Sequence, residues 1–140
     1  MRTKLHAAFL VIGLISCIAC TKEPPDSSTF SLIGTWGMES GTITDKDGTT
    51  SRYDKLGQNE YYQYLEFRTD GSFVETALPS MKASYGTYSY NDATRRLQYK
   101  YDGDKYFVPA SVNILSAKEI IINTDWGTVG SMTRHMIKQR

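Results

Sequence analysis

Residues 65–73, near the middle of the 140-residue chain, read Leu-Glu-Phe-Arg-Thr-Asp-Gly-Ser-Phe and decide the class of fold. Leu65 and Phe67 alternate with the charged Glu66 and Arg68. This alternation is typical of a strand that buries one face and exposes the other. The Asp-Gly dipeptide that follows is favoured in tight turns between antiparallel strands. The stretch therefore predicts a β-hairpin, with strands over residues 61–68 and 72–78.

The same pattern of short strands and turns extends outward from this hairpin in both directions. Leu97, Tyr99 and Tyr101 alternate with polar neighbours, and no stretch after residue 30 sustains a helical period. Residues 54–60 fit either a loop or one helical turn. Strands are expected at residues 31–44, 61–68, 72–78, 84–90, 96–101, 106–115, 119–124 and 131–138. Eight short strands in series predict an all-β domain over residues 30–140, a small antiparallel up-and-down β-barrel.

The N-terminus has a different character. Arg2 and Lys4 precede residues 7–19, which carry no charge and are rich in Leu, Ile, Val and Phe. A basic segment followed by an apolar one is the pattern of an export signal. As a helix, this run would span only about 20 Å, well short of the roughly 30 Å hydrocarbon core of a bilayer. Residues 1–19 are therefore expected to be a signal peptide, and residues 20–29 a polar, flexible linker.

Two cysteines end the apolar run, and their surroundings resemble the lipobox of bacterial lipoproteins. Cys17 follows the sequence Leu-Ile-Ser and matches the usual motif better, whereas Cys20 leaves the whole apolar run in the signal and begins a polar linker. Cys20 is the predicted lipidation site and Cys17 the alternative. The resemblance implies acyl chains such as palmitate and a membrane anchor in the cell envelope, with the outer membrane favoured and its face left open.

Composition excludes several kinds of chemistry once residues 1–19 are removed. One histidine, His135, and one cysteine, the predicted lipidation site Cys20, remain, so no zinc cluster, internal disulfide or Cys-His dyad with a free thiol can form. Loss of Arg2 and Lys4 leaves 14 basic residues against 15 acidic, which gives no electrostatic argument for binding nucleic acid. The carboxylates of Glu66, Asp70 and Glu75 have no evident catalytic partner. We expect no catalytic residue, no metal, no cofactor and no enzymatic activity.

Several motifs, in order, resemble one family. Residues 34–36, Gly-Thr-Trp, are similar to the Gly-x-Trp signature of lipocalins, and residues 65–73 resemble a hairpin of the lipocalin-like lipoproteins common in Bacteroidetes. Residues 86–90 and 132–138 resemble a later block and the closing strand of that group. The resemblance covers residues 32–138. It implies a lipocalin-like barrel in which Gly34, Trp36 and Arg134 have a structural role, with Arg134 packed over Trp36 to close the floor.

Two functions of different classes fit this sequence. The first is binding of a small apolar or amphipathic ligand in the barrel mouth, with Tyr61, Tyr88, Tyr90 and Tyr99 as candidate contacts. It predicts a cavity of about 300 Å³ or more. The second is a filled barrel that presents an aromatic surface to another protein or a glycan. A barrel of eight strands is just wide enough to be filled by its own side chains or to hold one small ligand. The oligomeric state stays open.

Overall fold

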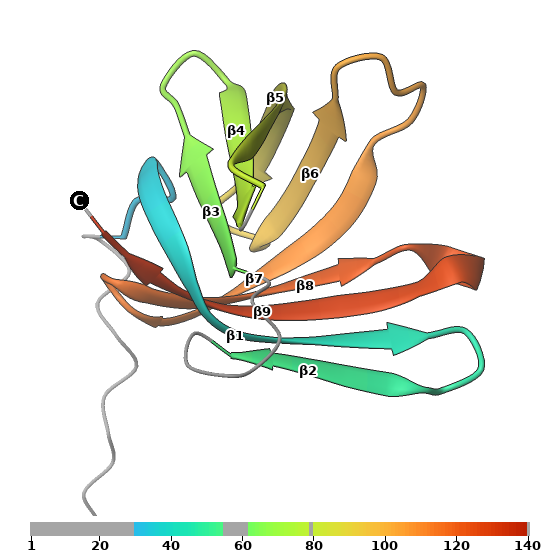
Figure 1. The fold of residues 1–140 in the computed structure, drawn as a ribbon. Helices are drawn as coiled ribbons and strands as arrows, with labels where there is room; N and C mark the ends of the chain where they lie inside the picture. The colour runs from blue at the N-terminus through green and yellow to red at the C-terminus, as the bar shows by residue number, and fades with distance from the viewer. Residues whose placement is uncertain (1–29, 55–61, 79, 140) are drawn as a thin grey trace, which may run out of the picture.

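The computed structural model describes residues 30–54, 62–78 and 80–139. Within these ranges the chain forms strands and turns, with a single 3-10 turn at Gly127–Val129 and no α-helix (Figure 1). The strands are β1 (Gly34–Asp45), β2 (Thr50–Asp54), β3 (Tyr62–Phe67), β4 (Ser72–Leu78), β5 (Lys82–Asn91), β6 (Arg96–Tyr101), β7 (Val108–Ser116), β8 (Glu119–Asp125) and β9 (Gly130–Lys138). No helix in the described part of the chain is long and apolar enough to span a bilayer.

Eight of these strands form a closed barrel. From β3 to β9 each strand pairs with the next in an antiparallel ladder, β1 pairs with β3, and the ladder between β1 and β9 closes the sheet. Closure pairs each of these eight strands with a neighbour on both sides, which protects strand edges along the ring. The all-β, up-and-down, eight-stranded barrel expected from the sequence is confirmed.

The ninth strand, β2, differs from the sequence prediction. It pairs with the second half of β1, residues 40–44, whereas β3 pairs with the first half, residues 34–37. A register shift between Met38 and Ser40 separates the two halves of β1. The β1–β2 and β8–β9 hairpins project side by side from the barrel (Figure 1). Thr50–Asp54 is exposed almost throughout, so it lacks the apolar alternation that identified the other strands.

Alternating hairpins define two ends of the barrel. The end that holds residues 30–33 is called the floor end. It also holds the β3–β4, β5–β6 and β7–β8 turns and the end of β9. The rim end holds the β1–β2, β6–β7 and β8–β9 connections. The buried apolar core is concentrated toward the floor end and includes Trp36, Met38, Phe67, Phe73, Leu97, Val112, Ile120, Ile122 and Met136.

Gly86 illustrates how closely the interior is filled. It faces Phe73 across the β4–β5 ladder and Tyr101 across the β5–β6 ladder. A Cβ atom at position 86 would lie 2.5 Å from Phe73 Cε1 and 2.2 Å from the backbone oxygen of Lys100. Glycine is therefore required here by close approach of the neighbouring strand and of an inward-pointing aromatic ring.

Candidate functional site

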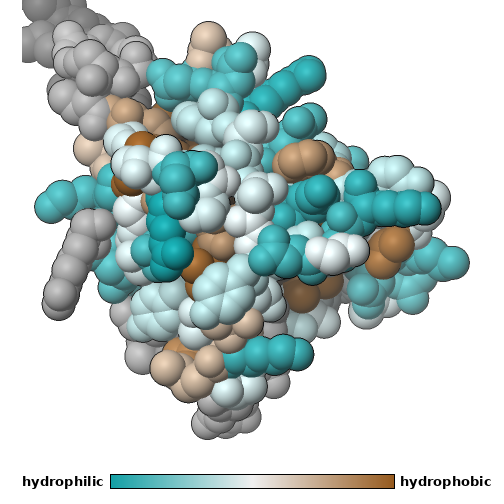
Figure 2. Space-filling view, turned by 90° about the horizontal axis from the view of Figure 1, so that it is seen from above, coloured by the Kyte–Doolittle hydropathy of each residue, from teal (hydrophilic) through white to brown (hydrophobic). Residues whose placement is uncertain are grey.

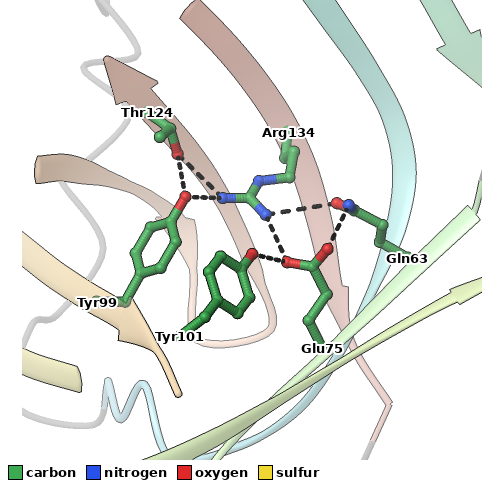
Figure 3. Close-up of polar contacts among 6 residues, drawn as sticks. All are labelled: Gln63, Glu75, Tyr99, Tyr101, Thr124 and Arg134. Carbon is green, nitrogen blue, oxygen red and sulfur yellow. Dashed lines mark hydrogen bonds and ion pairs between the residues drawn. The ribbon is translucent and has the colours of Figure 1, made fainter. Parts of the chain in front are cut away.

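A cluster of polar side chains occupies the interior of the barrel toward its rim end. Its members come from five strands and point toward one another (Figure 3). They are Gln63 on β3, Glu75 on β4, Tyr99 and Tyr101 on β6, Thr124 on β8 and Arg134 on β9. Each lies at a position of its strand that faces inward together with apolar neighbours, as Gln63 does with Leu65 and Phe67. Polar groups in such places must find partners inside the barrel.

Glu75 is held firmly by two neutral donors. Gln63 Nε2 donates to Glu75 Oε1 at 2.8 Å, and the Tyr101 hydroxyl donates to Glu75 Oε2 at 2.6 Å. Burial raises the pKa of Tyr101 far above its ordinary value, and the negative charge of Glu75 raises it further. Tyr101 therefore stays protonated and keeps its role as donor over the whole physiological range.

Arg134 is held more loosely. Its Nη2 donates to Thr124 Oγ1 at 3.0 Å and to the Tyr99 hydroxyl at 3.3 Å. Its Nη1 lies 3.4 Å from Gln63 Oε1 and 3.7 Å from Glu75 Oε2. The Nε atom is buried and has no hydrogen-bond partner among the described residues. A buried donor without a partner is costly, and the described residues leave this donor of the guanidinium unused.

Access to the cluster is uneven. Gln63, Thr124 and Arg134 are only 2 to 3% exposed, whereas the Glu75 side chain is 13% exposed and Tyr101 is half-buried. Beneath them, the space bounded by Leu65, Phe67, Phe73, Glu75, Leu97, Tyr99 and Arg134 measures only about 10 Å³. A space of that size admits about one water-sized group. Among the described members of the cluster, Glu75 and Tyr101 are therefore the side chains that a larger molecule can reach.

Four half-buried apolar side chains pack against the core outside its fully buried part. They are Ile43 on β1, Tyr53 on β2, Val108 on β7 and Trp126 at the start of the β8–β9 connection. Apolar and aromatic surface combined with a few polar groups is typical of small-molecule sites. The described residues hold no group of three or more His, Cys, Asp or Glu side chains that could bind a metal ion.

The residues expected to close the floor take different partners. Trp36 is fully buried, and its Nε1 donates to Leu32 O at 2.7 Å. The sequence prediction placed Arg134 over Trp36, but the Arg134 guanidinium lies 5.9 Å from the ring centroid of Tyr99. The cation over Trp36 is Lys138, whose Nζ is 5.2 Å from the ring centroid. In the β1–β9 ladder Trp36 pairs with Lys138, whereas Arg134 pairs with Gly41 further along β1, which explains the difference.

The candidate ligand-binding tyrosines do not form one site. Tyr99 belongs to the polar cluster. Tyr88 packs edge-on against Phe67, with a centroid distance of 4.9 Å, and Tyr90 contacts Phe30 near the floor end. Tyr61 lies outside the described residues, as do both candidate lipidation sites, Cys17 and Cys20.

Tyr88 and Tyr90 instead line an open groove of about 470 Å³ at the floor end, with Phe30 and several small polar residues. Phe30 and Tyr90 are in edge-to-face contact at 6.2 Å, and the Tyr88 hydroxyl donates to Arg68 O at 2.8 Å. On the face drawn in Figure 2, hydrophobic residues form small separate areas among hydrophilic ones.

Sequence reasoning missed Gln63, Glu75 and Thr124 as members of an interior site. Their positions carried a usable signal, because each occupies an inward position of a strand whose other inward residues are apolar. Glu75 follows Phe73 by two residues, and Thr124 follows Ile122 by two. A polar residue at such a position is expected either to disrupt the core or to have a partner inside it.

The closed barrel, its apolar floor and the polar cluster near its rim define a class of protein: a small β-barrel of the kind that binds small ligands. The sequence agrees with this class, because a model of the lipocalin-like domain matches residues 32–122. The chain belongs to the lipocalin-like domain family, which consists mostly of non-enzymatic binding proteins. No curated protein and no solved structure matches the chain.

Proposed function

We propose that this protein is a lipid-anchored binding protein of the cell envelope, whose barrel takes a small apolar or amphipathic ligand at its rim end. Membership of the lipocalin-like family supports small-ligand binding in general. The N-terminal sequence supports the anchor, because a basic segment, a short apolar run and a cysteine followed by a polar linker form the lipobox pattern. Two or three acyl chains on that cysteine make a stable anchor.

The observation that carries the binding proposal is the buried polar cluster around Arg134 and Glu75. A buried ion pair contributes little net stability, since apolar residues of similar volume do as well or better. The same holds for the polar side chains that support it. If stability alone had been selected, we would expect apolar side chains at these interior positions of the barrel. Arg134 with its unused Nε, and Glu75 with its partial exposure, are better explained by recognition of a ligand.

The dimensions of the interior place the ligand at the rim. The enclosed space next to Arg134 is about 10 Å³, so the cavity of about 300 Å³ or more that was predicted from the sequence is not found at this place. An apolar chain therefore lies above the cluster, against Tyr53, Val108 and Trp126, and its polar end meets Glu75 and Tyr101. Such a ligand is amphipathic rather than purely apolar.

A matched pair of variants tests this location. Val108 points inward at the rim end of β7, whereas Ser111 is exposed on the outer face of the same strand. The full chain held in amphipol is titrated with the neutral probe N-phenyl-1-naphthylamine, with empty amphipol as the blank. Val108→Trp should abolish specific binding and Ser111→Trp should preserve it. Absence of saturable binding by the unmodified protein, or equal binding by both variants, contradicts the proposal.

The anchor has its own test. Intact-mass measurement of the mature protein from a bacterial host should give a triacylated or diacylated chain beginning at Cys20. Cys20→Ala should then abolish acylation, whereas Cys17→Ala should leave it in place. The opposite pair of results would assign the anchor to Cys17, and an unmodified, released chain would contradict the anchor. Protease treatment of intact cells then distinguishes the cell surface from the periplasmic face.

A second function, binding of a glycan, is favoured by one observation, the floor-end groove. Phe30, Tyr88 and Tyr90 offer aromatic surface beside Ser31, Ser89 and Asp92, which can form hydrogen bonds with sugar hydroxyls. Tyr90→Ala tests it, because this change should weaken retention on a glycan array without affecting the rim. Retention that is unchanged by the substitution would remove this function.

A further inference from the structure

We propose that the ligand presents an uncharged hydroxyl group, rather than a carboxylate or an ammonium group, to the Glu75 side of the polar cluster. This inference rests on the proposed function, because it specifies the head group of the ligand that binds at the rim.

The first argument is charge balance. Arg134 and Glu75 carry opposite unit charges 3.7 Å apart, and the remaining members of the cluster, Gln63, Tyr99, Tyr101 and Thr124, are neutral. The cluster therefore has no net charge before a ligand arrives. A carboxylate or an ammonium group placed against it would add a charge that nothing in the cluster compensates, and burial of such a charge is strongly unfavourable.

The second argument is the hydrogen-bonding capacity that the cluster leaves unused. Glu75 accepts one bond on each carboxylate oxygen, and each oxygen has a further lone pair. Arg134 keeps an unused donor at Nε. The cluster as a whole thus offers both an acceptor and a donor. A hydroxyl group can donate to a free lone pair of the Glu75 carboxylate, and it can also accept a hydrogen bond. A carboxylate only accepts and would be repelled by Glu75, and an ammonium only donates and would be repelled by Arg134.

The third argument is size. The enclosed space bordered by Glu75 and Arg134 is about 10 Å³, which admits about one water-sized group. A hydroxyl group has that size, whereas a carboxylate with its two oxygens is larger. The alkyl part of the ligand remains among the half-buried Tyr53, Val108 and Trp126. A long-chain alcohol, or another neutral amphiphile that ends in a hydroxyl, meets all three conditions.

A series of three ligands with the same ten-carbon chain tests the head group. Decan-1-ol, decanoate and decylammonium are titrated calorimetrically at pH 7 into the full chain in amphipol, with empty amphipol as the blank. We expect decan-1-ol to bind at least about tenfold more tightly than either charged ligand. Equal or tighter binding of decanoate or decylammonium overturns the inference and leaves the proposed function standing. If none of the three binds, the proposed function itself fails.

A charge-removing variant adds a second, independent outcome. Glu75→Gln leaves Arg134 without its counter-charge, so preference should shift toward decanoate by about tenfold or more relative to decan-1-ol. Glu66→Gln is the matched control, since Glu66 points outward from the neighbouring strand and pairs with Arg68. It should keep the preference of the unmodified protein. A Glu75→Gln protein whose preference for decan-1-ol over decanoate is the same as that of the unmodified protein overturns the inference. If circular dichroism shows that this variant does not fold, the three-ligand series decides alone.

Discussion

The Tyr101 hydroxyl donates a hydrogen bond to Glu75 Oε2 at 2.6 Å, from β6 to β4 across the interior of the barrel. No ladder joins these two strands directly, because β5 lies between them. The bond therefore fixes the carboxylate at the more exposed side of the cluster. Removing this bond is the first prediction.

Tyr101→Phe should lower the free energy of unfolding at pH 7 by about 2 kcal/mol, because it removes a hydrogen bond to a charged acceptor. It should also change the response to alkali. Burial raises the pKa of Tyr101 in the folded state above its value in the unfolded chain. Above about pH 10 the hydroxyl therefore loses its proton in the unfolded chain but keeps it in the folded protein. The free energy of unfolding consequently falls as pH rises. The variant lacks this group and should lose stability less steeply. Urea unfolding between pH 8 and pH 11 measures both effects, and parallel curves for the two proteins would contradict the assignment.

Arg134 and Glu75 should behave as a coupled pair in unfolding experiments. Arg134→Met leaves the Glu75 carboxylate inside the barrel without its cation and should cost about 3 to 5 kcal/mol. Adding Glu75→Met to that variant removes the uncompensated charge and should restore stability to within about 2 kcal/mol of the unmodified protein. A double-mutant cycle by chemical denaturation measures the coupling. Purely additive losses would show that the two groups do not interact.

The sequence was sufficient for the fold because the strands that build the barrel alternate clearly. The predicted hairpin over residues 61–78 is present as β3 and β4, and its turn places Gly71 at a φ of 81°, which glycine favours. The alternation fails for β2, Thr50–Asp54, whose side chains are mostly polar and exposed. Its pairing with β1 depends on the irregularity after Met38, which no local pattern of residues indicates.

The polar cluster was harder to predict than the fold, because it depends on register. Alternation shows that Gln63, Glu75 and Thr124 face inward, but their meeting depends on how far neighbouring strands are staggered around the barrel. The same limit explains the exchange of Arg134 and Lys138. Both are cations on the last strand, and only the β1–β9 register decides which of them reaches Trp36. The family resemblance predicted that Arg134 packs over Trp36, whereas the β1–β9 ladder places Lys138 there.

Gly86→Ala should destabilise the barrel although it adds only one methyl group. The new carbon would lie 2.2 Å from the backbone oxygen of Lys100 and 2.5 Å from Phe73 Cε1, so the β5–β6 ladder must shift. We expect a loss of about 3 kcal/mol, at the upper end of overpacking effects. Phe73→Leu should not rescue the variant, since the closer contact is with backbone. Ser89→Ala on the exposed face of β5 is the control and should change stability by less than about 0.5 kcal/mol. Thermal denaturation compares them.

The contact between Lys138 and Trp36 gives a spectroscopic prediction. Lys138 Nζ lies 5.2 Å from the Trp36 ring centroid and donates to Ser31 O at 2.9 Å, which ties the end of β9 to the segment before β1. Burial lowers the pKa of Lys138, yet the amine still interacts with the electron-rich ring while it is charged. In a Trp126→Phe background, where Trp36 is the remaining tryptophan, Lys138→Met should shift the fluorescence emission of Trp36 and cost about 1 kcal/mol of stability.

Arg134→Met supplies the comparison in the same background. Its guanidinium lies over Tyr99 rather than over Trp36, so its removal should leave the position of the Trp36 emission unchanged even though it costs more stability. The two variants thus distinguish direct contact with Trp36 from a general loss of stability. Lys138→Met should cost less stability than Arg134→Met and yet produce the larger change in Trp36 emission. A shift caused by Arg134→Met, with none caused by Lys138→Met, would instead support the arrangement in which Arg134 closes the floor over Trp36.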